Sequence, residues 1–256
     1  MIPNIANRTW SKNVVRIVCI SDTHGKETSM PAIPLGDVLI HAGDFSSVGS
    51  FPEIEGFKKF VQSMKHPQKI VIAGNHEITL EPEFYLKSGR RFHSQLFRME
   101  GFDPVHYSED CCEEVCVSEP PTYNYLQDSS MRILTPFAGS SASDSGIEVY
   151  GAPWQPAFCN WAFNLYSSSA LKEKWDIIPT STDVLITHGP PYMILDRTVE
   201  GDFTGCQQLR EAIETRVKPR LHVFGHIHEA YGAFHYCTVA VIHVLYTFLH
   251  RLIVIE

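Results

Sequence analysis

The sequence has little of what marks several large classes of protein. Lys and Arg number 21 against 29 Asp and Glu, a formal net charge of −8, so the basic surface that follows a nucleic-acid backbone is missing. The first residues, MIPNIANRTWSKN, contain no long apolar stretch of the signal-peptide kind. The seven cysteines are odd in number and scattered, unlike a disulfide framework. We therefore expect a cytoplasmic protein in a reducing compartment, without a nucleic-acid polymer as partner.

The composition that is present belongs to a folded domain. The 256 residues are 44% hydrophobic and 20% charged, which is ordinary for a globular chain with a sizeable core. We predict a single domain over residues 1–256, interrupted by an irregular insertion at about 105–145. That segment contains SEDCCEEVCVSEPP and GSSASDSG, which are polar, rich in turn residues and without a clear period.

The end of the chain, about residues 233–256, is an atypical apolar tail. It contains the run TVAVIHVLYTFLHRLIVI, which is rich in β-branched residues and includes His243, His250 and Arg251. These features favour buried strands over a membrane-spanning helix. We expect no membrane association unless the tail is exposed.

Short runs of Val, Ile and Leu predict the strands of an α/β sheet. They are apolar on both faces, as in strands that are covered on both sides. Apolar residues at helical spacing mark Pro52–Lys65 and Gly205–Val217 between them. The predicted strands are Val14–Ser21, Asp37–Gly43, Lys69–Gly74, Asp183–Gly189 and Leu221–Gly225.

Each predicted strand ends in carboxylate, carboxamide or imidazole side chains. In an open α/β sheet the carboxyl ends of the strands meet at one edge, where ligands bind. One such motif is weak evidence, but an ordered set, each behind its own strand, leaves little room for coincidence. In chain order the motifs are Asp22-Thr23-His24, Gly43-Asp44, Gly74-Asn75-His76-Glu77, His188-Gly189 and Gly225-His226-Ile227-His228.

The donor atoms of these motifs suit metal ions. Oxygen and imidazole ligands without cysteine are typical of Mn²⁺, Fe or Zn²⁺ sites. The candidate ligands exceed the needs of one ion, and a bridging carboxylate would divide them between two ions ~3.5–4 Å apart. Two divalent ions, two carboxylates and one bridging hydroxide carry a net charge of about +1, which would attract a phosphate.

The ordered motifs resemble the signature of a known family. The patterns D-x-H, G-D, G-N-H-E, H-G and G-H-x-H, in this order, are similar to those of calcineurin-like metallophosphoesterases. Within that family, CISDTHG, IAGNHE, YGAPW, THGPP and HVFGHIHE most resemble the metallophosphoesterase domain-containing proteins. The resemblance runs from about Val15 to Gly232, apart from the middle insertion. It implies a four-layer αββα sandwich, with two mixed sheets flanked by helices.

The resemblance also implies roles for individual residues. Asp44 would bridge two divalent ions, with Mn²⁺ the first candidate and Fe or Zn²⁺ the alternatives. His76 would bind no metal, and would instead protonate the leaving oxygen or stabilise the transition state. The other ligands would be Asp22, His24 and His228 on the first ion, and Asn75, His188 and His226 on the second.

The predicted activity is hydrolysis of a phosphodiester by a metal-bound hydroxide. After Gly43-Asp44 the chain reads FSSVGS, without the D-R-G continuation of protein serine/threonine phosphatases, whose arginines clamp a phosphomonoester dianion. The resemblance points to cyclic nucleotides or related small diesters as substrates. The alternative is a weakly active or inactive scaffold of the same fold that binds metal or nucleotide. A nuclease is disfavoured, because no basic groove with interleaved aromatic residues is visible.

Three further residues have structural and functional interpretations. Tyr192 of GPPY and Trp154 of GAPW either shape the substrate pocket or pack beside rigid turns. His41 lies within a predicted buried strand, which favours a core or supporting role.

Overall fold

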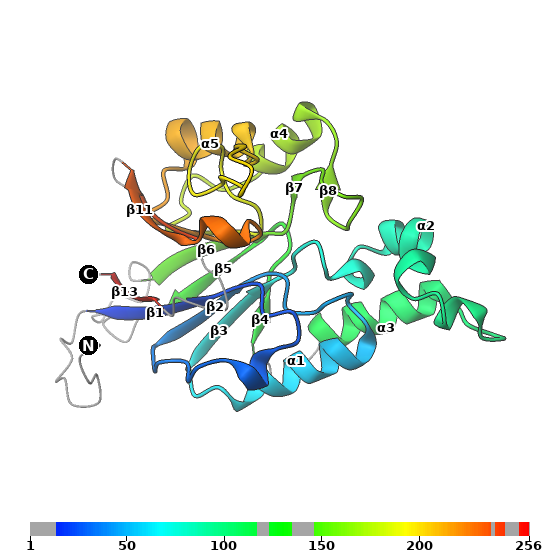
Figure 1. The fold of residues 1–256 in the computed structure, drawn as a ribbon. Coiled ribbons are helices and arrows are strands. Elements are labelled where there is room, and N and C mark those ends of the chain that lie inside the picture. The colour runs from blue at the N-terminus through cyan, green and yellow to red at the C-terminus, as the bar shows by residue number, and fades with distance from the viewer. Residues whose placement is uncertain (1–13, 117–122, 135–145, 237–238, 244–250, 256) are drawn as a thin grey trace.

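Two β-sheets packed face to face form the centre of the molecule, and helices cover their outer faces (Figure 1). The structure is a computed structural model that describes residues 14–116, 123–134, 146–236, 239–243 and 251–255. The first sheet has the order β13-β1-β2-β3-β4. Its strands are β1 (Val15–Ile20), β2 (Val38–Ala42), β3 (Gln68–Ile72), β4 (Asn124–Tyr125) and β13 (Arg251–Ile255).

The second sheet has the order β11-β12-β10-β9-β6-β5. Its inner strands are parallel, whereas β11 and β5 are antiparallel to their neighbours. In the first sheet β13 is the antiparallel strand, so both sheets are mixed. The strands of the second sheet are β5 (Ser129–Leu134), β6 (Gly146–Ala152), β9 (Val184–Thr187), β10 (Leu221–Phe224), β11 (Gly232–Tyr236) and β12 (Val239–His243). A short parallel pair, β7 (Gln155–Pro156) and β8 (Asn164–Leu165), stands apart from them.

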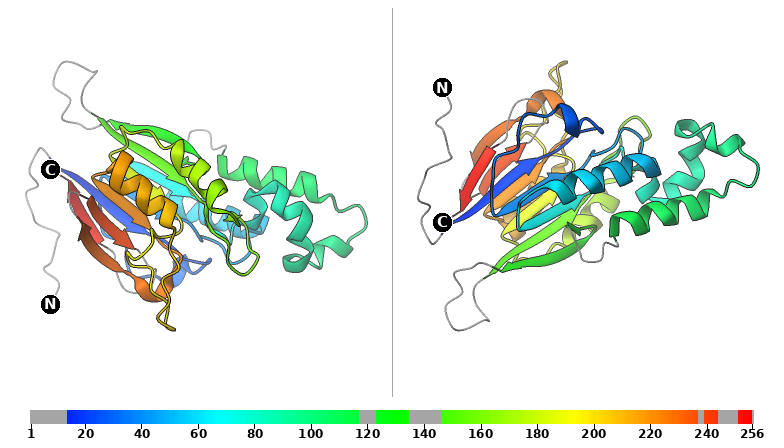
Figure 2. Two further views of the ribbon diagram at one scale, coloured as in Figure 1. Left: turned by 90° about the horizontal axis from the view of Figure 1, so that it is seen from above. Right: turned by 90° about the horizontal axis from the view of Figure 1, so that it is seen from below.

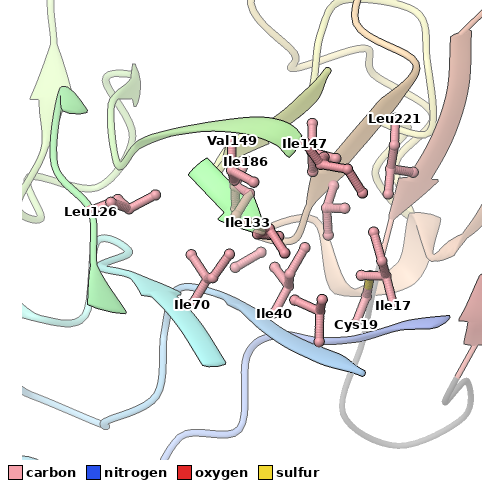
Figure 3. Close-up of a cluster of buried hydrophobic side chains, with 14 of the residues drawn as sticks. Ile17, Cys19, Ile40, Ile70, Leu126, Ile133, Ile147, Val149, Ile186 and Leu221 are labelled. Atoms are coloured by element: carbon pink, nitrogen blue, oxygen red, sulfur yellow. The ribbon is translucent and has the colours of Figure 1, made fainter. Parts of the chain in front are cut away.

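The main hydrophobic core lies between the two sheets, and Figure 3 shows its side chains meeting from both. Aliphatic side chains dominate it, which is what strands apolar on both faces require. The first sheet contributes Ile17, Cys19, Ile40 and Ile70, and the second contributes Ile133, Ile147, Val149, Ile186 and Leu221.

Helices complete the outer layers. On the first sheet these are α1 (Phe51–Ser63), α2 (Pro82–Phe92) and α3 (Pro104–Cys116), and on the second α4 (Ser168–Asp176) and α5 (Gln207–Ala212). Seen from above and below, α2 and α3 extend beyond the sheets (Figure 2). The order helix, sheet, sheet, helix confirms the αββα architecture that the resemblance implied.

The sequence explains where α1 begins. The hydroxyl and the backbone N–H of Ser50 both donate to the Glu53 carboxylate, at 2.7 and 2.9 Å. This capping box satisfies groups that the first turn of a helix leaves unpaired. The predicted helix Pro52–Lys65 is thereby confirmed, and Gly205–Val217 is confirmed as α5 continued by a π-helical turn.

The insertion predicted at 105–145 is regular where the structure describes it, so that prediction was wrong there. Most of its first part belongs to α3, and β5 forms an edge strand antiparallel to β6. Residues 117–122 and 135–145 lie outside the described residues.

The sequence pattern did not predict α3, because small polar side chains lie on its buried face. The hydroxyl of Ser108 donates to the carbonyl of Thr79 at 2.6 Å, and the Cys111 thiol is fully buried. Neither residue gives the apolar period by which an amphipathic helix is recognised.

The apolar tail supplies strands to both sheets. β11 and β12 extend the second sheet beside β10, and β13 pairs with β1, with Ile255 opposite Val15. The prediction of strands rather than a spanning helix is confirmed for these residues, while 237–238 and 244–250 lie outside the described residues. In the part of the chain that the structure describes, no helix has both the length and the apolarity to cross a membrane.

Candidate metal centre

The predicted strand-end residues converge on one site, although their strands belong to two sheets. The ends of β1, β2 and β3 in the first sheet meet those of β9 and β10 in the second, rather than sharing the edge of one open sheet. Their donor atoms form three overlapping groups, each within 4.8 Å: Asp22, His24 and His228; His24, Asp44 and His76; Asp44, His188 and His226. The carboxamide Oδ1 of Asn75 lies 3.1 Å from Nε2 of His188, so all the predicted site residues come together.

Backbone hydrogen bonds join the loop after β1 to the loop after β2. The N–H of Asp22 donates to the carbonyl of Gly43 at 2.9 Å, and that of His24 to the carbonyl of Asp44 at 3.0 Å. The exposed fractions of Asp22 and Asp44 are only 1% and 2%. The main chain therefore fixes both carboxylates at the base of the site.

Asp44 occupies the centre of the cluster. Its Oδ2 lies 3.3 Å from Nε2 of His188, 3.9 Å from Nε2 of His76 and 4.0 Å from Nε2 of His24. Its Oδ1 accepts the backbone N–H of His76 at 2.9 Å. This carboxylate belongs to two of the three groups of donor atoms, which is the position that a bridging ligand requires.

Backbone carbonyls orient three of the imidazoles. Because a carbonyl oxygen only accepts, each Nδ1 carries a proton, and Nε2 is the nitrogen that faces the cluster. The contacts join Nδ1 of His24 to Ser46 (3.1 Å), of His76 to Ser47 (2.7 Å) and of His188 to Ala42 (2.9 Å).

The buried carboxylates are held in their charged form by the neighbouring imidazoles. Burial alone would raise the pKa of Asp44, but the charge of His188 holds it well below its usual range. Burial would lower the pKa of His188, and Asp44 instead raises it to about 9. Burial would also raise the pKa of Asp22, but its contact with His228 at 3.3 Å and the charge of His188 together lower it to about 2. The site therefore keeps the carboxylates of Asp22 and Asp44 negatively charged, so they could bind a cation.

Four site residues adopt left-handed backbone conformations, which residues with a Cβ atom rarely do. Their φ angles are +54° at Asp22, +47° at His24, +54° at Asp44 and +76° at His226. Each such conformation costs on the order of 1–3 kcal/mol and persists only where the surroundings over-determine it. The tight turns at these strand ends point the side chains into the site.

Glycines of the motifs leave room for the carboxylates. A Cβ atom on Gly225 would collide with the carboxylate of Asp22 and the hydroxyl of Ser21. A Cβ atom on Gly74 would collide with the carboxylate of Asp44. The backbone comes so close to these two carboxylates that only glycine fits at both positions.

Glu77 supports the site, although the G-N-H-E motif in which it stands predicts no role for it. Its fully buried carboxylate accepts hydrogen bonds from the backbone N–H groups of Asp44, Ser46 and Gly74 and from the Ser46 hydroxyl, at 2.6–2.8 Å. Burial raises its pKa to about 8, although all four partners donate and so favour the carboxylate form. Glu77 ties the loop after β2 to the loop after β3.

Trp161 is a second supporting residue, and unlike Glu77 it lies in no sequence motif. Its ring stacks on that of His76, with centroids 4.1 Å apart and planes at 23°. The Trp161 ring also contacts Phe92 of α2, and the centroids of these two rings lie 4.6 Å apart. Together with the carbonyl of Ser47, this stack fixes the orientation of the His76 imidazole. FCNWAF, the segment around Trp161, carries no recognisable motif.

A cleft of about 710 Å³ opens over the cluster. Phe158 and Trp161 are its aromatic lining residues, rather than Tyr192 or Trp154. Trp154 donates from Nε1 to Asp128 at 2.8 Å, so it fits the packing interpretation. The remaining lining residues are Asp44, Asn75, His76, Pro156, Ala157, Gly189, Pro190, Thr198, Glu200, Asp202, Thr204, His226, Ile227, His228 and Glu229.

His41 and His222 occupy matching positions in the two sheets. His41 is buried in β2 and contacts Thr23 Oγ1 at 3.1 Å, and His222 is buried in β10 and contacts Thr187 Oγ1 at 2.8 Å. Burial lowers both pKa values to about 3. Both are neutral rings that brace the strands behind the site, as the core interpretation of His41 expected.

The cluster fits divalent metal ions. Its three groups contain carboxylates and imidazoles and no cysteine, which is the donor set of Mn²⁺, Fe and Zn²⁺ sites. The histidines whose Nδ1 atoms are held by carbonyls show the supporting contacts that metal-binding imidazoles usually have. The assignment of individual residues to each ion stays a prediction, as does the non-ligand role of His76.

Comparison with known proteins agrees with the geometry. The family model described as calcineurin-like phosphoesterase matches residues 15–230. The chain is 42% identical over 218 residues to metallophosphoesterase domain-containing protein 1 of Homo sapiens, and equally to that of Mus musculus. It is 38% identical over 220 residues to the UPF0046 protein T07D4.2 of Caenorhabditis elegans. These matches cover 85% of this chain, 61% of the human and mouse proteins and 52% of the nematode protein.

Solved structures share the fold at low sequence identity. One superposes with a TM-score of 0.57 and covers 90% of both chains, at 13% identity. TT1561 of Thermus thermophilus gives a TM-score of 0.50, with 90% of this chain and 88% of that one covered, also at 13% identity.

Proposed function

This chain belongs to the calcineurin-like phosphoesterase family, and we propose that it is a dinuclear metal-dependent phosphodiesterase acting on cyclic nucleotides or related small phosphodiesters. The observation that carries the proposal is the position of Asp44, shared between groups of metal-competent donor atoms from both sheets. Because the chain spans about three fifths of its human and mouse relatives, the proposal concerns this domain.

The cluster would hold two ions as the motifs predict. Asp44 would bridge them, with Mn²⁺ the first candidate and Fe or Zn²⁺ the alternatives. Bound divalent ions would polarise the phosphoryl oxygens and lower the pKa of a water molecule. The ligands of the first ion would be Asp22, His24 and His228, and those of the second Asn75, His188 and His226.

His76 would supply the proton that the departing alkoxide needs. The Ser47 carbonyl holds its Nδ1 proton, and Trp161 fixes the ring, so that Nε2 lies 3.9 Å from Asp44 Oδ2 at the base of the cleft. A proton held at Nε2 is placed to reach the oxygen of a scissile ester.

The charge of the cleft supports a diester over a monoester. Among the described residues, no Lys or Arg lines it, so this lining offers no fixed cation to match the second charge of a phosphomonoester. The substrate partner would be a small phosphodiester or nucleotide.

The six cysteines among the described residues are all free thiols, which supports a reducing, cytoplasmic setting.

The test is hydrolysis of bis(4-nitrophenyl) phosphate by the purified protein with and without Mn²⁺, beside 4-nitrophenyl phosphate. We expect metal-dependent turnover that favours the diester. With a cyclic nucleotide, whose leaving group is an alkoxide, His76→Ala should lower kcat by about 10²–10⁴-fold at unchanged metal content, because it removes the proton donor. The effect should be smaller with the 4-nitrophenyl ester, whose leaving group departs without a proton. The matched control is His106→Ala on α3, whose side chain is 72% exposed. Absence of turnover in folded, metal-loaded protein would contradict the proposal and favour a binding scaffold.

A further inference from the structure

The first turn of α1 holds the loop that follows β2. The Glu53 carboxylate in this turn accepts the backbone N–H of Ser47 through Oε1 at 2.9 Å. Its Oε2 accepts the N–H and the hydroxyl of Ser50, at 2.9 and 2.7 Å. The capping box explains only the second oxygen, because Ser47 lies before the N-cap of the helix. The first oxygen therefore holds the loop, not the helix.

Ser47 is also the residue that holds the imidazole of the proposed proton donor. Its carbonyl accepts from Nδ1 of His76 at 2.7 Å, the shortest of the three contacts between a site imidazole and a carbonyl. Its hydroxyl donates to the carbonyl of His24 at 3.2 Å. The backbone of Ser47 thus connects Glu53 on α1 to His76 in the cleft, so a displacement of this backbone would move the imidazole.

A full negative charge lies behind the peptide unit that holds His76. Burial would raise the pKa of Glu53, but the hydroxyl of Ser50 and the backbone of Ser50, Ser47 and Val48 together lower it. The N–H of Val48 and the carbonyl of Ser47 belong to one planar peptide unit. A carboxylate on the N–H side polarises that unit and strengthens the hydrogen bond on its carbonyl side.

The other contacts of the His76 ring do not determine which edge faces the cleft. Trp161 stacks on the ring at 4.1 Å, and the His24 ring meets it edge-on at 4.5 Å. A stacked neighbour fixes the plane of an imidazole, but a flip of the ring within that plane exchanges nitrogen and carbon positions. Nε2 lies 3.9 Å from Asp44 Oδ2, too far for a hydrogen bond. Among the described residues, the bond to Ser47 is therefore the contact that sets the edge.

We propose that Glu53 is a positioning residue for the proposed hydrolysis. By holding the backbone of Ser47 it keeps Nδ1 of His76 toward the loop and Nε2 toward the leaving oxygen. The proton moves from Nε2 of the cationic ring to that oxygen, and the neutral ring keeps its Nδ1 proton on the Ser47 carbonyl. Glu53 itself neither lines the cleft nor belongs to the groups of donor atoms. This inference rests on the proposed phosphodiesterase function and adds to it a residue from outside the strand-end motifs.

The test compares two diesters of the same charge that differ in their leaving groups. Bis(4-nitrophenyl) phosphate releases a stable anion that needs no proton, whereas diphenyl phosphate releases the more basic phenolate. Glu53→Ala should lower kcat for diphenyl phosphate about tenfold, with KM and metal content unchanged. It should lower kcat for bis(4-nitrophenyl) phosphate by less than about twofold, because that reaction does not depend on the proton donor.

Two control variants separate positioning from helix stability. Ser50→Ala weakens the same cap but leaves the bond between Glu53 and Ser47 in place. Glu55→Ala removes an exposed carboxylate of α1 that pairs with Lys59 at 2.8 Å. Neither control should lower turnover of one diester more than that of the other. Equal losses with both diesters in Glu53→Ala, or a selective loss in Ser50→Ala, would overturn the inference, since Glu53 would then only stabilise α1.

Nuclear magnetic resonance gives a measurement that does not depend on turnover. In the metal-free protein, the ¹⁵N shifts of the neutral His76 ring, assigned with His76→Ala, show which nitrogen carries the proton. We expect the Nδ1–H form in the wild type and a shift toward the Nε2–H form in Glu53→Ala. Glu53→Gln, which keeps the length of the side chain, should give the same shift at smaller size if the alanine variant does not fold.

The two measurements keep the inference apart from the function on which it rests. An unchanged proton position in both Glu53 variants would overturn the role of Glu53, while turnover by the wild type would leave the phosphodiesterase function standing. Absence of turnover of either diester by the wild type would overturn that function, and the proton position would then decide the coupling of Glu53 to His76 alone.

Discussion

The floor and the rim of the cleft are built in opposite ways. The floor consists of residues 22–25, 43–47 and 74–77, which follow the first three strands, and the rim consists of residues 198–204 and Glu229. Side chains of the floor are mostly buried and joined by backbone hydrogen bonds across the loops. The rim is largely exposed, with 78% of Val199 accessible to solvent.

This difference separates two tasks of the site. A floor that fixes carboxylates and imidazoles to within about half an ångström preserves the chemistry, and any change there disturbs several partners at once. A rim of exposed side chains on a loop can change its charge at little cost to the fold. If the proposed function holds, we expect reaction type and substrate preference to depend on different residues.

Among the variants that test this comparison, Asp44→Asn in the floor should have the largest effect on activity and metal content. The substitution keeps the shape of the side chain but removes the charge between both groups of ligands. We expect activity to fall by about 10³-fold or more, together with metal content measured by elemental analysis. Asp176→Asn, an exposed change on α4, serves as the control. Retention of both metals at wild-type activity would show that Asp44 does not bridge them.

Gly225→Ala should have the next largest effect. The new Cβ atom would displace the carboxylate of Asp22, so we expect the affinity for metal to fall about 10–100-fold. The displacement should also lower the free energy of unfolding by about 1–3 kcal/mol. Both quantities can be measured by metal titration and by urea denaturation.

A glycine in open space provides the contrast to Gly225. Gly56 lies on the exposed side of α1, and a Cβ atom there would meet nothing within 4 Å. Gly56→Ala should raise the free energy of unfolding by about 0.5–1 kcal/mol, because alanine is the better helix former. If both substitutions had the same sign, the steric explanation for Gly225 would fail.

A last pair of variants, measured by stability alone, makes the same chemical change in both regions. Glu77→Gln in the floor replaces a carboxylate oxygen by an amide group that faces hydrogen-bond donors, so it should lower the free energy of unfolding by about 1–3 kcal/mol. Glu200→Gln in the rim should change it by less than about 0.5 kcal/mol. Urea denaturation of the two variants measures the difference directly, and equal losses would contradict the division into floor and rim.

The sequence predicted the floor of the site well and its surroundings poorly. All five predicted strands carrying motifs are present, because runs of Val, Ile and Leu leave few alternatives to a doubly covered strand. Their side chains meet because both sheets place the carboxyl ends of these strands at one place. That the strands belong to two sheets followed from the resemblance and not from the pattern of residues.

The parts that escaped prediction depend on contacts without a local pattern. α3 hides Ser108 and Cys111 on its buried face, and Trp161 reaches His76 only through the path of a loop. Glu200 and Asp202 look like ordinary solvated charges until the fold places them at the cleft. Local periodicity reports on strands and helices, whereas these residues acquire their roles from tertiary structure.

The pairing of β13 with β1 has a consequence for how the chain reaches its folded state. β1 leads directly into Asp22 and His24, yet its neighbour on one side lies almost a whole chain length away in sequence. Contacts of such long separation form late, since the ends of a long loop must first meet. During synthesis the edge of β1 therefore stays uncovered until β13 has left the ribosome, and in that interval β1 is exposed to mispairing with another chain.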